Sequence, residues 1–273
     1  MIQETKLPYQ LYSAGTQSPL AALSWHLGRN EIQEGPNAWI LLLGSESRGG
    51  EEVKKPFNIV INPIEKVVLP FDKFCYELGE QLAQTNYALM TASPNFERLI
   101  HGQCNLGFNT SLKKSRKAIN SKDYLRHYRL ENNSVSESEL ANATIITYLS
   151  AELDRLIQSM TSLPNAAILI GGNESTKDLA LKCLQNGRPV FPLAKSGGAA
   201  KQFYDLLLEN YTYVENDPVE TSFANIKVNL QIVYQHPLDV KALDQPYKGA
   251  IAEIISHLNM IYAPDDPRMY SKE

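Results

Sequence analysis

Two glycine pairs in the second half of the chain occur where a strand is expected to give way to a helix. Gly171 and Gly172 follow the apolar run 166–170, and Gly197 and Gly198 come one strand-helix unit later. A helix that begins at such a turn presents unpaired N–H groups and partial positive charge, and glycine lets an anion approach the main chain closely. The chemistry that these residues favour is phosphate binding, so we expect a nucleotide ligand.

The residues expected to contact this ligand come from both turns and from the ends of two earlier strands. They are Gly171, Gly172, Asn173, Glu174, Ser175, Thr176, Lys195, Ser196, Gly197, Gly198, Thr91, Ser93 and Asn62. The ammonium group of Lys195 would neutralise a phosphate as a point charge. Ligands of open parallel sheets bind along the edge formed by the carboxyl ends of the strands, so both turns should lie at that edge. For either glycine pair alone, the alternative is close backbone packing at a strand-to-helix corner.

The hydrophobic pattern predicts the sheet that must hold these turns. Strands are expected at residues 57–61, 87–90, 143–148, 166–170 and 188–193, alternating with helices whose apolar residues recur at spacings of three and four. Ser175 and Asp178 resemble a capping box that starts one helix, Gly187 should end it, and Ser93 should cap another. This alternation predicts an α/β protein with a Rossmann-like parallel sheet and helices on both faces.

The chain is expected to contain three regions. Residues 1–50, which include the apolar strand 39–43, form an N-terminal arm or an extra sheet edge. Residues 51–215 form the nucleotide-binding core, and residues 216–273 extend the same domain. Within that extension, alternation predicts a strand over residues 226–234, and a stripe of isoleucine and leucine predicts a helix over residues 250–261.

One basic concentration lies between residues 104 and 139. It consists of Lys113, Lys114, Arg116, Lys117, Lys122, Arg126, His127 and Arg129. One interpretation is a solvated helix and loop, and the other is a lid or rim that draws an anionic ligand toward the glycine turns. The sequence alone does not separate them.

Composition excludes several classes of function. The net charge of −4 gives no basic footprint for duplex nucleic acid. No apolar run approaches the roughly 18 residues of a membrane span, and the N-terminus lacks a signal pattern, so a cytoplasmic protein without membrane partners is expected. The three cysteines and five histidines show no metal-ligand or disulfide spacing, so no metal or cofactor is expected. The three-glycine dinucleotide fingerprint and the P-loop pattern are absent, which argues against an NAD dehydrogenase or an NTPase.

The segment from GGNEST through NGRPVFPLAKSGGAA resembles the SLOG superfamily. This Rossmann-like fold is shared by LOG phosphoribohydrolases, DprA-type proteins and the nucleotide-sensing domains found with TIR and Sir2 effectors. The likeness is to that family's Gly-Gly-x-x-Gly-Thr turn and its Gly-x-Pro-Val-x-Pro continuation before Gly-Gly-Ala-Ala. It covers about half of the chain, most clearly residues 166–204.

The resemblance implies two hypotheses for function. One is a sensor or sequestering protein for an ADP-ribose-like or cyclic nucleotide, as in bacterial defence signalling, with a homodimer and a separate effector chain as expected partners. The other is an N-ribosidase in which Asp178 or Glu174 supplies the catalytic carboxylate and Arg155 orients the ribose phosphate. Ser175 replaces the family's third glycine, the turn is one residue longer, and Asp178 replaces a glutamate, so the sensor is the leading hypothesis.

Overall fold

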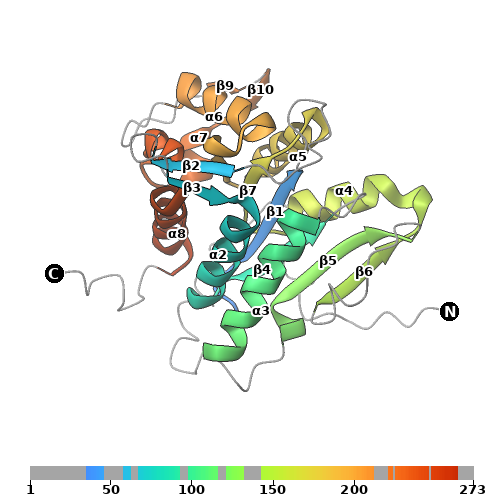
Figure 1. Ribbon diagram of the computed structural model, residues 1–273. Coiled ribbons are helices and arrows are strands. Elements are labelled where there is room, and N and C mark those ends of the chain that lie inside the picture. The colour runs from blue at the N-terminus through green and yellow to red at the C-terminus, as the bar shows by residue number, and fades with distance from the viewer. Residues whose placement is uncertain are drawn as a thin grey trace. The chain divides into compact units, whose positions relative to one another are not determined.

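The computed structural model describes residues 35–45, 58–62, 67–92, 98–115, 121–131, 143–211, 221–223, 225–245 and 247–263. The chain divides into two units, residues 1–35 and 36–273, and every element below belongs to the second. That unit contains a six-stranded sheet in which all neighbouring strands run parallel, with helices on both faces (Figure 1). The predicted α/β, Rossmann-like fold class is therefore confirmed.

The sheet has the strand order β6-β5-β4-β1-β7-β8. Its strands are β1 (Trp39–Ser45), β4 (Ala88–Ala92), β5 (Leu125–Leu130), β6 (Thr144–Tyr148), β7 (Ala166–Gly171) and β8 (Val190–Leu193). After β1 the chain builds the sheet outward through β4, β5 and β6, then crosses back to place β7 and β8 on the other side of β1. The strand order therefore reverses between β1 and β7, and ligands of open α/β sheets bind at such a point.

The position of β1 corrects the expectation of an arm or extra sheet edge for residues 39–43. β1 pairs with β4 on one side and with β7 on the other, so it lies in the middle of the sheet. Its leucines, from Leu41 to Leu43, are buried from both faces. A strand covered on both faces is expected to be a continuous apolar run, and this one is.

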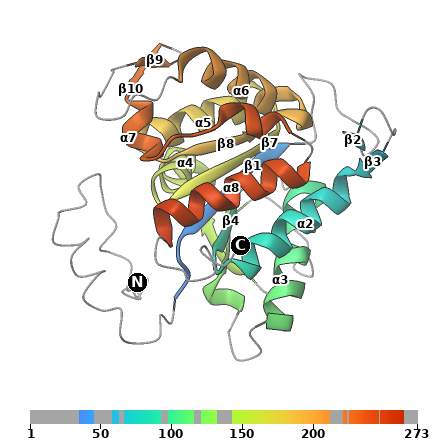
Figure 2. The same ribbon diagram turned by 90° about the vertical axis from the view of Figure 1, so that its left-hand side faces the viewer.

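Helices cover the two faces of the sheet (Figure 2). One face carries α2 (Phe71–Gln84), α3 (Gln103–Ser115) and α8 (Tyr247–Tyr262), and the other carries α4 (Leu153–Ser162) and α5 (Glu174–Gln185). The helix α6 (Gly198–Asn210) packs against β7 and β8. Helical turns of three to five residues complete the connections: η2 (Arg98–Gly102), η3 (Ser121–Asp123), η4 (Ser150–Glu152), η5 (Ala194–Ser196) and η6 (Val240–Asp244).

The helices α2 and α3 are in direct backbone contact through two glycines. A methyl group on Gly79 of α2 would overlap the carbonyl oxygen of Cys104, and one on Gly107 of α3 would overlap the carbonyl oxygen of Tyr76. Each glycine therefore provides the space into which the other helix fits. This pair of helices is the most extensive helix-to-helix contact among the described residues.

The run 57–61 is not part of the main sheet, which corrects a second expectation. β2 (Asn58–Asn62) pairs with β3 (Val67–Pro70) in a separate antiparallel hairpin that leads directly into α2. The hairpin contacts η5, at the carboxyl end of β8. Asn62 thus belongs to a hairpin near the sheet edge rather than to a strand of the sheet.

The basic segment contributes a strand that the sequence did not reveal. β5, with the sequence LRHYRL, lies between β4 and β6, and Lys113 and Lys114 lie on exposed positions of α3. The guanidinium of Arg126 lies 4.0 Å from the centre of the Trp39 ring, and His127 is fully buried. Neither the solvated interpretation nor the lid describes these residues of β5. Arg116 and Lys117 lie outside the described residues.

The C-terminal extension contains β9 (Thr221–Phe223), β10 (Ile226–Val228), α7 (Leu230–Tyr234), η6 and α8. The predicted helix over residues 250–261 is confirmed as part of α8, but the strand predicted over 226–234 ends at Val228. It ends there because Asn229 caps α7 by accepting from the N–H groups of two following residues, at 3.1 and 3.2 Å. The hydroxyl of Tyr234 then reaches the outer strand β8 and donates to the carbonyl of Val190, at 2.5 Å.

Candidate functional site

The two glycine turns lie side by side at the carboxyl ends of β7 and β8. The N–H of Ala199 donates to the carbonyl of Gly172 at 2.9 Å, and the N–H of Gly171 donates to the hydroxyl of Ser196 at 2.7 Å. A methyl group on Gly198 would overlap the carbonyl oxygen of Gly172, so the second turn requires glycine there. The structure therefore brings the N-termini of α5 and α6 together at one edge of the sheet.

The helix α5 begins two residues earlier than the capping-box interpretation placed it. Asn173, not Ser175, is its N-cap: the Asn173 side chain accepts from the N–H of Thr176 at 3.2 Å, and the Thr176 hydroxyl accepts from the N–H of Asn173 at 3.4 Å. Glu174 and Ser175 then occupy the first helical positions, where an N–H has no acceptor within the helix. Both residues are exposed.

Ser196 was expected to contact the ligand as part of the second turn, and the structure gives its side chain a role within the fold. Its hydroxyl is buried, accepts from Gly171 and donates to the carbonyl of Leu193 at 2.5 Å. The hydroxyl thus connects the end of β8 to the end of β7. It holds the second turn in a fixed position relative to the first.

Replacing Ser196 with alanine is expected to lower the free energy of unfolding by about 2 kcal/mol, because the buried N–H of Gly171 would lose its acceptor. Urea unfolding followed by circular dichroism measures this change. Ser162→Ala is the matched control, since the Ser162 hydroxyl bonds the Gln158 carbonyl at an exposed site of α4. A Ser196→Ala loss no larger than that of the control would contradict the connecting role.

Charged side chains near the turns are paired with one another. Glu174 is exposed and pairs with Lys177 at 2.5 Å, and the Lys177 ammonium also donates to Gln202 of α6 at 3.4 Å. Lys195, on η5, pairs with Asp244 of η6 at 3.3 Å. Both lysines therefore lie close to the helix N-termini, and each is paired with a carboxylate.

Arg155 and Asp178 are not placed at the glycine turns. Arg155 is on α4, where its exposed guanidinium pairs with Glu152. The pKa of the Glu152 carboxyl lies below its usual range, mainly because the N–H of Leu149 donates to it, and secondly because this guanidinium donates to it. Asp178 is exposed one helical turn along α5 from Glu174. The structure thus pairs Arg155 with the neighbouring Glu152 and leaves Asp178 at an exposed position of α5.

Thr91 belongs to a buried polar cluster on β4, β5 and η2 that the sequence did not reveal. Its hydroxyl lies 2.8 Å from Nδ1 of His127, its register partner on β5. The pKa of His127 is lowered to about 4, mainly by burial and to a smaller extent by the charge of Arg129. The pKa of His101 is lowered to about 3, mainly by burial and to a smaller extent by His127. Thr91 is only 1% exposed, so its side chain faces the interior rather than solvent. Ser93 lies outside the described residues.

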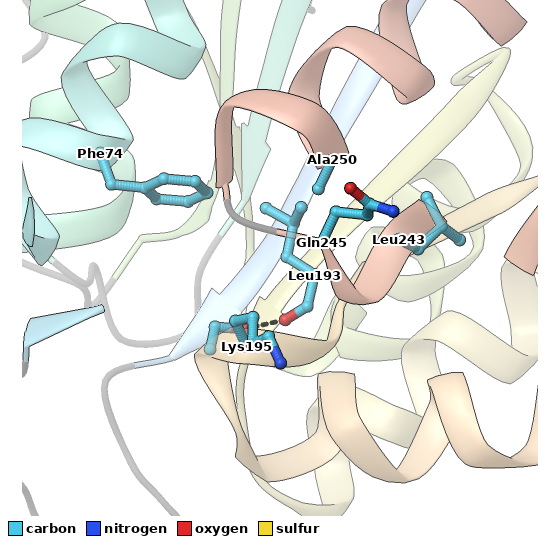
Figure 3. A pocket seen from close by; sticks show the side chains of 7 residues that line it. Phe74, Leu193, Lys195, Leu243, Gln245 and Ala250 are labelled. Atoms are coloured by element: carbon cyan, nitrogen blue, oxygen red, sulfur yellow. Dashed lines mark hydrogen bonds between the residues drawn. The ribbon is translucent and has the colours of Figure 1, made fainter. Parts of the chain in front are cut away.

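A small hollow lies beside the second turn, between β8, α2 and the η6–α8 segment (Figure 3). Its volume is about 10 Å³, roughly the space of one water molecule, and it is lined by Phe74, Leu193, Lys195, Ser196, Leu243, Gln245 and Ala250. Phe74 points into it from α2, while Leu243 and Gln245 face it from the opposite side. The hollow is therefore largely apolar, with Lys195 and Gln245 as its long polar side chains.

The described residues contain neither a membrane-spanning helix nor a metal-binding cluster. No helix there is both long and apolar enough to cross a bilayer. In the same residue ranges, no group of three or more His, Cys, Asp or Glu side chains could hold a metal ion.

No protein-family model matches the sequence, and no curated protein matches it. Fourteen chains of solved structures match, among them the X-ray structure of TM1055, a target of the Northeast Structural Genomics Consortium. That match has 14% identity and a TM-score of 0.44, and it covers 73% of this chain and 99% of the other. A likeness at this level does not indicate what the protein binds.

Proposed function

We propose that this protein binds a nucleotide or a nucleotide-derived signal, of the ADP-ribose-like or cyclic nucleotide type, and acts as a sensor or sequestering protein. The observation that carries the proposal is the pairing of two helix N-termini through the hydrogen bond from Ala199 to Gly172. Each N-terminus contributes N–H groups and partial positive charge, and both face one edge of the sheet. A phosphate is the ligand group that fits these donors.

The location of the turns supports the same function. Gly171 ends β7, next to the point where the strand order reverses between β1 and β7. At Gly44 of β1 the neighbouring strand β7 is so close that an added Cβ would lie 2.5 Å from the Ile170 carbonyl oxygen. The backbone at this edge is therefore tightly fixed, and fixed donors lose little entropy when a ligand binds.

The pairing of Arg155 supports the choice of binding over hydrolysis. An N-ribosidase needs a carboxylate and a cation at the reacting centre, within hydrogen-bond reach of the substrate. Here Arg155, the cation expected to orient the ribose phosphate, pairs instead with Glu152 beside the start of α4. We therefore propose binding without turnover.

The test measures affinity for AMP, ADP, ADP-ribose and cyclic AMP by isothermal titration calorimetry, with native mass spectrometry to count bound molecules. Gly197→Ala is expected to weaken binding of the best ligand by about tenfold, equivalent to 1.4 kcal/mol. The reason is that nothing lies within 4 Å of a Cβ at Gly197, so the new methyl group would occupy the space proposed for phosphate.

Gly187→Ala is the matched control. Gly187 also has a positive φ, 71° against 74° for Gly197, and also has open space around its Cβ, but it lies at the far end of α5. Gly187→Ala should cost about 1 kcal/mol of stability. Gly197→Ala should cost about 1–3 kcal/mol, because a φ of 74° with a ψ of −162° is found essentially only in glycine. Only Gly197→Ala should reduce the affinity of the folded protein. The proposal fails if none of the four nucleotides binds, or if both variants lose affinity equally. Steady release of free base from a nucleotide would instead favour the ribosidase.

A further inference from the structure

Three lysines lie around the glycine turns, and their partners differ. Lys177 bonds within the α5–α6 pair, and Lys201 pairs with Asp205 one turn along α6. Lys195 alone among these three pairs with a residue far along the chain, Asp244 of η6. Its partner therefore comes from the C-terminal extension rather than from the phosphate-binding elements.

The backbone of Lys195 is fixed relative to the turns. Its neighbour Ser196 is hydrogen-bonded to both Leu193 and Gly171, and Gly197 donates its N–H to the carbonyl of Ala194 at 3.0 Å. Only the side chain of Lys195 is then left to move. Lys195 is two residues before Gly197 in the chain, and a lysine side chain is long enough to turn toward a group bound there. Lys195 also borders the hollow of Figure 3.

The Lys195–Asp244 pair is weak enough to be exchanged. The two side chains are 46% and 39% exposed, and pairs of this kind contribute little because water screens them. A phosphate offers more negative charge and stronger charge-assisted hydrogen bonds than one carboxylate. Asp244 would still face a cation after the exchange: Asp205 raises the pKa of Lys201 through a hydrogen bond, and the charge of Asp244 adds to that effect.

We propose that Lys195 is a switchable phosphate ligand, which is held by Asp244 in the empty protein and moves to the second phosphate of a nucleoside diphosphate whose first phosphate occupies the glycine turns. This inference rests on the proposed function and deepens it. It makes Asp244 a specificity-determining residue that competes with the ligand, and it identifies the ligand class as nucleotides with at least two linked phosphates.

The experiment is a double-mutant cycle, read as affinities for ADP and AMP by calorimetry. Asp244→Asn should tighten ADP binding by about fivefold, because Lys195 no longer has a competing partner. Fivefold is the change in affinity that corresponds to the free energy of a half-exposed ion pair. Lys195→Met should weaken ADP binding by about tenfold. Binding of AMP should change less than about twofold in both variants, since AMP has no second phosphate. In the double variant, the effect of Asp244→Asn should disappear.

The controls match the changes in charge. Lys182→Met near the end of α5 and Asp154→Asn at the start of α4 alter the net charge by the same amounts at exposed sites away from η5 and η6, and neither should change ADP affinity. The inference is overturned if Asp244→Asn acts equally with and without Lys195, or if AMP and ADP respond alike. If Gly197→Ala weakens ADP binding while Lys195→Met does not, only this inference fails. If no nucleotide binds, the proposed function fails and this inference fails with it.

Discussion

Replacing Gly107 with alanine is expected to lower the free energy of unfolding by about 3 kcal/mol, at the upper end of overpacking effects. The added methyl group would overlap the carbonyl oxygen of Tyr76, which belongs to the backbone of α2 and has no rotamer to change. Relief requires α2 and α3 to move apart along their contact, which exposes apolar surface on both helices. Gly79→Ala should have a similar effect, through the carbonyl of Cys104. Urea unfolding followed by circular dichroism gives the size of the loss.

Gly249→Ala is the control for this prediction, with an effect of opposite sign. Gly249 is also a helical glycine, in α8, but a Cβ there would lie 3.3 Å from the nearest atom, the Cβ of Gln245, instead of overlapping a backbone carbonyl. Alanine is favoured over glycine within helices by about 0.5–1 kcal/mol, so this variant should be slightly more stable. If Gly107→Ala and Gly249→Ala changed stability in the same direction and by similar amounts, the backbone contact would not limit the helix crossing.

Lowering the pH from 6.5 toward 4 is expected to destabilise the protein steeply. The pKa of His127 and that of His257 are lowered to about 4, and the pKa of His101 is lowered to about 3. Burial is the largest cause for all three. In the unfolded chain, histidine titrates near pH 6.5, so below that pH the unfolded state binds more protons than the folded state. Each histidine then contributes a slope of about 1.4 kcal/mol per pH unit, and three together approach about 4 kcal/mol per pH unit.

The sign of this effect defines the pH window. The stability is fully present above pH 6.5, is lost as the pH falls, and the loss from each histidine levels off below its folded pKa. His257→Phe should remove about one third of the slope, because phenylalanine binds no proton. His257 packs against Phe191 and Tyr234, and a phenyl ring retains this apolar contact, so the variant should still fold. Urea unfolding at a series of pH values from 7.5 to 4.5 measures the slope. An unchanged slope in both His257→Phe and His127→Gln would show that burial of these rings does not produce the acid sensitivity.

Features set by neighbouring residues in the chain were predictable from the sequence. The spacing of Phe74, Leu78 and Leu82 indicated α2, and Gly187 marked the end of α5, because each signal depends only on one turn of helix. The N-cap was misplaced for a local reason. Asn173 and Ser175 are both residue types that cap helices, and the structure uses Asn173, directly after Gly171 and Gly172, which both have positive φ.

Features set by distant residues were not predictable. The strand 57–61 is as apolar as β1, yet it forms a hairpin while β1 occupies the sheet centre; only the pairing partners distinguish them. β5 reads as polar, but His127 is hydrogen-bonded to Thr91 and Arg126 stacks on Trp39, contacts that require the folded sheet. The same limit applies to the site. The glycine turns were visible in the sequence, whereas the pairing of Lys195 with Asp244 depends on where η6 folds back.

The contact between Tyr234 and Val190 bears on how copies of this protein can aggregate. An outer strand with free N–H and carbonyl groups recruits further strands, from a native neighbour or from a misfolded one. On β8, the hydroxyl of Tyr234 donates a hydrogen bond to the carbonyl of Val190, so that this carbonyl already has a partner. Pro192, two residues further along β8, has no N–H to donate. This border of the sheet is thereby protected against strand addition. Removing the hydroxyl would open a route to fibrous assembly that the native chain has closed.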